Sequence, residues 1–146
     1  MTKPTKISDI KRAWHVIDLK EKPLGRMATQ IAKLLMGKQK SYFVRNLDCG
    51  DYVIVINVAD VVITGRKETQ KRYYHYSGYP GGLRSENYAD LKKRKPKEII
   101  EHAVKGMLPQ NKLRDKMLGR LHIYMDDQHP YEDKLKAQMS NVKSTS

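Results

Sequence analysis

The chain has 146 residues, and 29 Lys and Arg side chains against 16 Asp and Glu give it a net charge of +13 at pH 7. That length predicts a single domain that folds without disulfides or a metal, and a lone cysteine excludes a disulfide within the chain. No apolar run approaches the roughly 20 residues of a membrane span, and no secretory signal is recognisable, so we expect a cytoplasmic protein. The positive charge should attract polyanions, with nucleic acid as the first candidate partner and an anionic membrane surface as the second.

The first half of the chain alternates segments typical of strands and helices. Residues 1–12 are polar and basic and predict a flexible arm, and Trp14–Asp18 predicts a short strand. Apolar residues at helical spacing predict a helix that starts near Pro23 and stops at Gly37. Residues 51–58 form the most apolar run, as expected of a strand covered on both faces in a parallel sheet, and residues 61–65 indicate another strand or a short turn.

The second half contains a charged segment between two regions with a regular apolar pattern. Residues 66–95 predict a basic loop extension, because charges lie among the aromatic residues of 66–84 and glycine and proline break regular structure there. Pro96 can begin a helix that ends near Gly106. Residues 112–118 predict a short helix, and residues 120–125 predict a last strand. We therefore expect an α/β core over 13–125 with a mostly parallel sheet, followed by a polar, loosely held tail over 126–146.

The basic segment is the strongest candidate for a binding site. Residues 66–84 (RKETQKRYYHYSGYPGGLR) combine five cations with four tyrosines and a histidine, and residues 66–97 hold ten cations against three acids. Cations beside exposed aromatic faces suit phosphates and unstacked bases. The alternative is a solvated loop whose tyrosines pack on the body of the protein, but the clustering of charge favours a binding face.

Motifs for catalysis, cofactors and metals are poor. The chain lacks a dinucleotide-binding glycine motif and a phosphate-binding loop, and no pair of carboxylates is placed for acid–base chemistry. His122, Asp126, Asp127 and His129 come nearest to a metal cluster, but their spacing matches no known arrangement, and acidic neighbours disfavour Cys49 as a nucleophile. We expect no enzyme, no cofactor, no metal and no small-molecule substrate. Three rival hypotheses are a small RNA-modifying or nucleotide-handling enzyme, a free regulatory nucleic-acid-binding module, and a protein docked on anionic membranes.

Two blocks about 20 residues apart, 78–83 (GYPGGL) and 104–109 (VKGMLP), resemble the signature blocks of the bacterial large-subunit ribosomal protein thirteen family. Further blocks agree in order from about Trp14 to Pro130, including 24–26 (LGR), 50–53 (GDYV) and 64–67 (TGRK). The sequence departs from the family pattern at Val44, at Leu19, at residues 126–127 and in the tail after Pro130.

This resemblance implies a three-layer α/β/α sandwich on a four-stranded parallel sheet. It also implies a structural protein of the large ribosomal subunit that binds large-subunit (23S) ribosomal RNA early in assembly, in the cytoplasm, beside neighbouring ribosomal proteins. It implies no catalytic activity and no required cofactor.

The candidate RNA-binding residues fall into two groups, with some weaker candidates on the first helix. The first group surrounds the glycine turn: Arg66, Lys67, Lys71, Arg72, Tyr74, His75, Tyr79, Gly81, Gly82 and Arg84. The second group follows the second signature block: Lys105, Lys112, Arg114 and Arg120. The weaker candidates are Arg26, Lys38 and Lys40.

Overall fold

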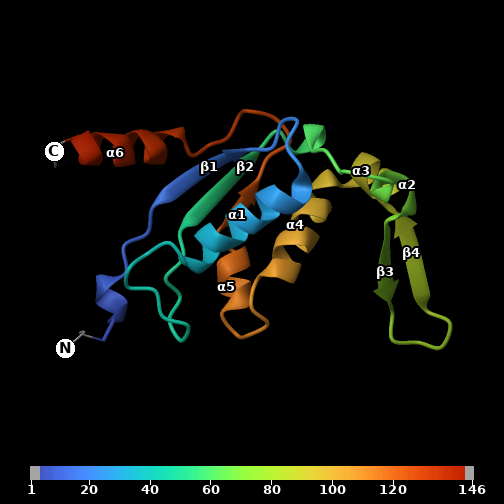
Figure 1. Ribbon diagram of the computed structural model, residues 1–146, viewed down its shortest axis with the longest axis horizontal. Helices are drawn as coiled ribbons and strands as arrows, with labels where there is room; N and C mark the ends of the chain where they lie inside the picture. Colours follow the sequence, from blue (N-terminus) through green and yellow to red (C-terminus); the bar gives the residue numbers. More distant parts are fainter. Residues whose placement is uncertain (1–3, 144–146) are drawn as a thin grey trace.

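A three-stranded parallel sheet forms the centre of the protein. In the computed structural model, which describes residues 4–143, strands β1 (Trp14–Asp18), β2 (Tyr52–Ile56) and β5 (Leu121–Ile123) lie in the order β1-β2-β5 (Figure 1). Val16 lies beside Ile54, which in turn lies beside His122. The predicted strands and the parallel sheet are confirmed, because continuous β-branched runs such as that of β2 belong in a strand buried on both faces.

Helices α1 (Leu24–Met36) and α4 (Pro96–Met107) pack on one another and cover one face of the sheet (Figure 1). Both were predicted from their apolar spacing, and Ile31, Leu35 and Ile100 from these stripes are fully buried. Gly37 ends α1 with a φ of 75°, a left-handed conformation that glycine adopts without strain. Pro96 occupies the first turn of α4, where its missing N–H costs no hydrogen bond.

Two shorter helices complete the connections between strands. Helices α3 (Tyr88–Arg94) and α5 (Arg114–Leu118) flank α4 in the long connection from β2 to β5. Gly50, just before β2, lies against the end of α1 so closely that a Cβ atom there would overlap the carbonyl oxygen of Leu35. The start of β2 can therefore reach α1 only with glycine at this position.

The fourth strand and the closed sandwich are not confirmed among the described residues. Residues 61–65, expected to form a strand or a turn, contribute one isolated parallel bridge, between Val62 and Pro23. Gly65, with a φ of 74°, then turns the chain away from the sheet. The coarser expectation holds: a mixed α/β protein with a mostly parallel sheet and a separate antiparallel pair of strands.

The second face of the sheet carries a stack of aromatic rings. Trp14 lies 4.3 Å from the ring of Tyr52 and 4.9 Å from that of Tyr131, and Tyr131 lies 4.7 Å from His122. Burial, assisted by the positive charge of Lys134, lowers the pKa of His122 and favours its neutral form. No group of three or more metal-ligating side chains occurs in the part of the chain that the structure describes, and His122 takes part in this stack instead.

The two ends of the chain contain short helices and contact the core. In the expected arm, residues 7–9 form a 3-10 turn, and the Arg12 guanidinium donates to the carbonyl oxygen of Gly50 at 2.7 Å. In the expected loose tail, residues Glu132–Lys143 form helix α6, whose Gln138 accepts a hydrogen bond from the backbone N–H of Trp14. Residues 1–3 and 144–146 of the predicted arm and tail lie outside the described residues.

A cluster of ionic side chains ties the start of β2 to its neighbours. The two Nη atoms of Arg120 donate to both carboxylate oxygens of Asp48, and one also donates to the carbonyl oxygen of Leu35 at 3.1 Å. Asp51 is paired with Lys40 at 2.5 Å and accepts from the backbone N–H of Ala13 at 3.0 Å. Both carboxylates are shielded from water, so these pairs fix the geometry of the chain where it enters the sheet.

These pairs predict a loss of stability in acid. Burial alone would raise the pKa of Asp48, but the hydrogen bonds and charge of Arg120 outweigh it and hold that pKa below the usual 3.8. Burial likewise opposes ionisation of Asp51, and its hydrogen bonds to His15, Ala13 and Lys40 lower its pKa all the same. A carboxylate with a lowered folded-state pKa stabilises the fold above the unfolded-state pKa, and the effect is lost as the pH falls through the folded-state value.

We therefore expect the free energy of unfolding, measured in urea, to fall steeply below about pH 4. An Asp48→Asn variant, which already lacks one of these carboxylates, should show a flatter profile over the same pH range. Equal slopes in the two proteins would contradict this origin of the acid sensitivity.

Candidate nucleic-acid interface

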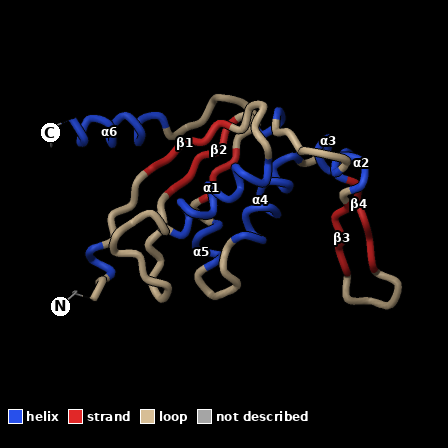
Figure 2. The backbone as a smooth tube through the Cα atoms, in the orientation of Figure 1, coloured by secondary structure: helices blue, strands red, loops and turns tan. Residues whose placement is uncertain are grey.

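The basic segment forms a projecting β-hairpin. A short helix α2 (Lys67–Gln70) leads into strand β3 (Arg72–Tyr76), which pairs antiparallel with β4 (Leu83–Asn87). The hairpin extends from one end of the protein, away from the three-stranded sheet (Figures 1 and 2). The expectation of a loop over residues 66–95 is wrong, because this segment contains two short helices and a pair of strands. A two-stranded ribbon that projects from the body leaves most of its charged side chains in solvent and need not bury them.

The tip of the hairpin is the predicted glycine turn. Gly78 and Gly81 have φ values of 88° and 72°, which glycine adopts without strain. The backbone N–H of Ser77 donates to the carbonyl oxygen of Gly82 at 3.2 Å and closes the loop. Tyr79 stands at the tip with 76% of its surface exposed.

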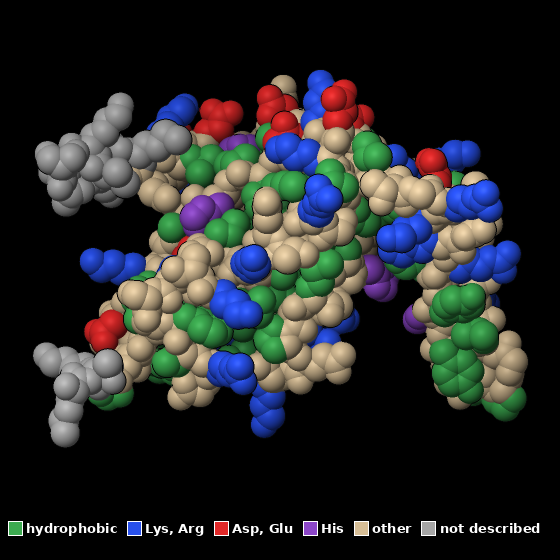
Figure 3. All heavy atoms as spheres, viewed as in Figure 1, with side chains coloured by type: hydrophobic (Ala, Val, Ile, Leu, Met, Phe, Trp, Pro, Cys, Tyr) green, Lys and Arg blue, Asp and Glu red, His purple; other side chains and the backbone are tan. Residues whose placement is uncertain are grey.

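One face of the hairpin is aromatic and exposed. The antiparallel register places Tyr74 opposite Ser85 and Tyr76 opposite Leu83, so these four side chains share one face, on which Arg72 also lies. Tyr74, Tyr76 and Leu83 are each more than 60% exposed. Figure 3 shows hydrophobic side chains gathered on the hairpin, with Lys and Arg side chains around its upper part. This is the kind of surface on which bases or riboses can stack.

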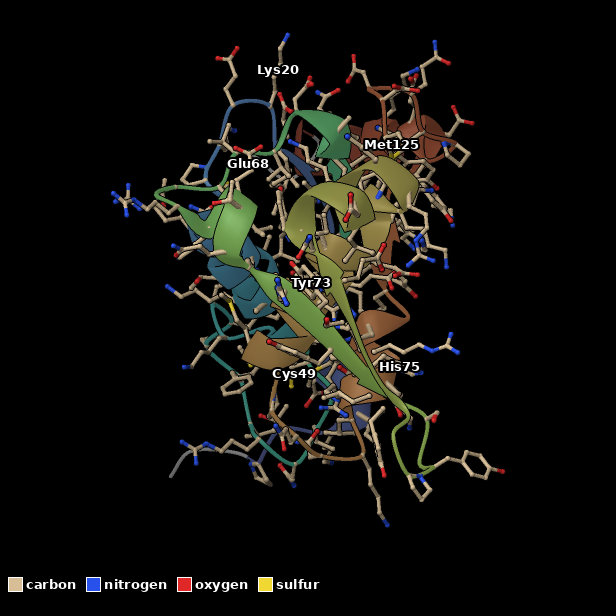
Figure 4. All side chains as sticks on the ribbon, turned by 90° about the vertical axis from the view of Figure 1, so that its right-hand side faces the viewer. Lys20, Cys49, Glu68, Tyr73, His75 and Met125 are labelled. Atoms are coloured by element: carbon tan, nitrogen blue, oxygen red, sulfur yellow. The ribbon has the colours of Figure 1, made fainter. Side chains whose placement is uncertain are left out.

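The other face of the hairpin looks onto the body of the protein. Here His75 lies opposite Arg84, and the half-buried ring of Tyr73 lies 5.5 Å from that of His102 on α4. Figure 4, viewed from the hairpin side, shows Tyr73 near the base of the hairpin and His75 farther along it. Burial raises the pKa of Tyr73. Burial, with smaller contributions from Tyr73 and Glu68, raises the pKa of Tyr88 at the hairpin base to about 12.

An ion pair braces this second face. Arg94 on α3 donates to both carboxylate oxygens of Glu86 on β4, from Nε at 3.1 Å and from Nη2 at 2.5 Å. No sequence pattern indicated this brace, because Glu86 and Arg94 are eight positions apart, on a strand and on the helix that follows it. The pair connects strand β4 of the hairpin to helix α3 of the body.

The cations at the base of the hairpin form no ion pairs among the described residues and can bind an anionic partner. Arg66 precedes α2, Lys67 opens it, and Lys71 joins α2 to β3. None of the three forms an ion pair within the described residues, and the Lys71 ammonium lies 5.2 Å from the centre of the Tyr73 ring. Unpaired cations that remain hydrated in the free protein can exchange water for phosphate oxygens.

The structure brings the first candidate group together but divides it between two faces and a tip. Arg72 and Tyr74 lie on the exposed face, His75 and Arg84 on the face toward the body, and Tyr79, Gly81 and Gly82 at the tip. Arg66, Lys67 and Lys71 surround the base.

The second group does not form one surface. Lys105 on α4 and Lys112 before α5 are exposed, whereas Arg114 is half-buried. Arg120 is only 7% exposed and its guanidinium is held by Asp48, so a phosphate cannot reach it. Lys40, one of the weaker candidates, is likewise paired inside the protein, with Asp51.

Comparison with known proteins agrees with the resemblance of the signature blocks. The sequence model of the family described as ribosomal protein L13 matches residues 12–130, most of the chain. The chain belongs to the ribosomal protein L13 family. Proteins of the ribosomal protein L13 family are structural components and not enzymes, as expected from the missing catalytic motifs.

Curated members of the ribosomal protein L13 family are similar over nearly their whole length. A protein of Dehalococcoides mccartyi named large ribosomal subunit protein uL13 is 54% identical over 130 residues, 89% of this chain and 91% of that protein. A protein of the same name from Natranaerobius thermophilus is 50% identical over 90% of this chain and 90% of that protein. Another from Thermobifida fusca is 51% identical over 87% of this chain and 85% of that protein. None of the described helices is long and apolar enough to cross a membrane.

Proposed function

We propose that this protein is a structural constituent of the large ribosomal subunit that binds 23S ribosomal RNA early in assembly. The observation that carries the proposal is the projecting hairpin, with exposed tyrosines on one face and unpaired cations at its base. The names of the relatives support the same role, since each is called a large ribosomal subunit protein.

The chemistry of the hairpin suits folded RNA. Arg66, Arg72 and Arg84 present planar guanidinium groups that can grip phosphates with two hydrogen bonds, and Lys67 and Lys71 act as point charges. Tyr74 and Tyr79 present ring faces on which unstacked bases of loops and bulges can lie. Lys105, Lys112 and Arg114 extend the proposed contact set, and Arg120 is left out because its charge is satisfied internally.

The proposed setting is the ribosome in the cytoplasm, with neighbouring ribosomal proteins as further partners. The ionic cluster around Asp48 and Asp51 and the stack around Trp14 stabilise the core through contacts within the chain. A core that folds by itself can present the hairpin before its neighbours arrive, which supports binding at an early stage.

The test is binding of the purified chain to large-subunit ribosomal RNA in the presence of excess transfer RNA. If about six to ten phosphates are contacted, we expect affinity to fall about a thousandfold or more between 50 and 200 mM salt. We also expect binding to survive the competitor at physiological salt. Complete displacement by transfer RNA would overturn the proposal of a primary RNA binder, because charge alone would then explain the association.

A further inference from the structure

A hollow of about 440 Å³ lies beside the base of the hairpin. It is formed by the first turn of α1, the segment that leads from residue 63 into α2, and the end of α4. Its lining divides into two kinds of side chain. Leu24, Ile63, Ala103 and Met107 form an apolar floor, and Arg26, Thr64, Lys67 and Lys71 form a polar rim.

The rim is positively charged without internal compensation. Arg26, Lys67 and Lys71 form no ion pair within the described residues, and no acidic side chain lines the hollow. The cleft under the hairpin, of about 540 Å³, is different, because Glu86 and Glu98 line it and are paired with Arg94 and Lys95. The charge of the smaller hollow therefore favours an anion, whereas that of the cleft is largely balanced.

The floor of the hollow exposes an apolar side chain, that of Met107, to solvent. Met107 at the end of α4 is 41% exposed, an unusual setting for a large apolar side chain beside cations. The sulfur atom of Met107 lies 3.5 Å from the hydroxyl oxygen of Thr29, so the Met107 side chain contacts helix α1. A thioether of this kind makes favourable contacts with the edges and faces of flat aromatic rings.

We propose that this hollow holds one unstacked nucleotide of the bound RNA, with its base or ribose on the apolar floor and its flanking phosphates on Arg26, Lys67 and Lys71. This inference rests on the proposed function and adds a second contact region, on the body of the protein. Lys67 and Lys71 belong to both the hairpin base and the rim, so one RNA strand can pass from hairpin to hollow without a break in positive charge.

The sharpest test is a Gly25→Asp variant. Gly25 lines the hollow, and a Cβ atom added there meets nothing within 4 Å, so a side chain can leave the backbone there without a clash. Helix α1 has no acidic residue in its first turn, and a carboxylate near a helix N-terminus is stabilising. The melting temperature should therefore stay the same or rise, while affinity for large-subunit ribosomal RNA should fall about tenfold because phosphates are repelled.

A Gly25→Ala variant is the matched control. It adds the same Cβ atom without charge and should bind RNA as the unchanged protein does. The slope of log affinity against log salt should be smaller by about one to two in Gly25→Asp than in this control. Met107→Ala tests the floor: affinity should fall several-fold with an unchanged salt slope, because no phosphate contact is lost.

The outcomes separate this inference from the function on which it rests. If Gly25→Asp binds RNA like Gly25→Ala, the nucleotide site is overturned, and the hollow is left for a contact with a neighbouring protein. If excess transfer RNA displaces the unchanged protein from large-subunit ribosomal RNA, the proposed function itself is wrong. If Met107→Ala binds with full affinity, the base or ribose does not lie on the floor.

Discussion

An Arg120→Met variant should lose about 3–5 kcal/mol of folding free energy, because it leaves the shielded Asp48 carboxylate with only the longer and more exposed pairing to Arg12. Arg120, the residue before β5, reaches both Asp48 and the Leu35 carbonyl oxygen near the end of α1, so its removal also leaves that carbonyl without this donor. For a chain of this size the melting temperature should fall by roughly 10 to 20 °C. Urea unfolding at pH 7 measures the effect.

Arg12 provides the control for this variant. It pairs with the same carboxylate at 3.4 Å, but its side chain is 31% exposed, against 8% for Arg120. Arg12→Met should therefore cost less, about 1–2 kcal/mol, with the lost hydrogen bond to the Gly50 carbonyl oxygen included. Combining Arg120→Met with Asp48→Asn should cost less than the two single changes added together, since the unpaired charge is gone. Similar losses for Arg12→Met and Arg120→Met would contradict the assignment of Arg120 to the interior.

The largest expected effect on function comes from Arg72→Ala combined with Arg84→Ala. Each charge-assisted contact to a phosphate contributes about 1.5 kcal/mol, so losing two should weaken binding to large-subunit ribosomal RNA about a hundredfold. Both side chains are exposed and form no ion pair among the described residues, so the melting temperature should stay within about 2 °C. Competition binding and thermal unfolding of the same samples give both values.

The matched control removes two positive charges elsewhere. Lys20 and Lys136 are exposed and lie away from the hairpin, Lys20 in the turn after β1 and Lys136 on α6. Lys20→Ala with Lys136→Ala has the same net charge as the hairpin variant and should bind nearly as well as the unchanged protein. An equal loss in both variants would mean that only net charge matters, and a loss of folding with full RNA affinity would contradict the assignment of the hairpin.

The two arginines also report how the RNA approaches. Arg72 lies on the exposed face of the hairpin and Arg84 on the face toward the body. If RNA grips the hairpin from both sides, the single variants should each weaken binding by about tenfold. If only one face is used, one single variant should be silent.

The sequence predicted those parts of the fold that depend on local periodicity. The stripe of α1, the glycine that ends it and the β-branched run of β2 each carry their signal within a short window, and each is confirmed. The hairpin had no such signal. In the run from Arg72 to Tyr76 aromatic residues occupy both faces, so no apolar alternation marks the strand, and its register depends on pairing with β4.

The candidate site shows the same division between local and long-range information. Clustered charge located the hairpin, because all its residues are close in sequence. The burial of Arg120 could not be predicted in this way, because its partner Asp48 is 72 residues away in the sequence. The residues next to Arg120 in the sequence do not indicate that its side chain is buried. The hollow next to α1 likewise combines residues from positions 23 to 107 that meet only through the packing of α1 on α4.

Trp14, the single tryptophan of the chain, lies between Tyr52 and Tyr131 with the Lys134 ammonium 4.8 Å from its ring centre. Its fluorescence is therefore an intrinsic optical reporter of whether α6 and the preceding segment are seated on the sheet. The hairpin projects from the opposite end of the protein (Figure 1), so we expect binding at the hairpin to leave the emission of Trp14 unchanged. Emission from one native residue thus distinguishes detachment of the C-terminal helix from events at the hairpin end, without any added label.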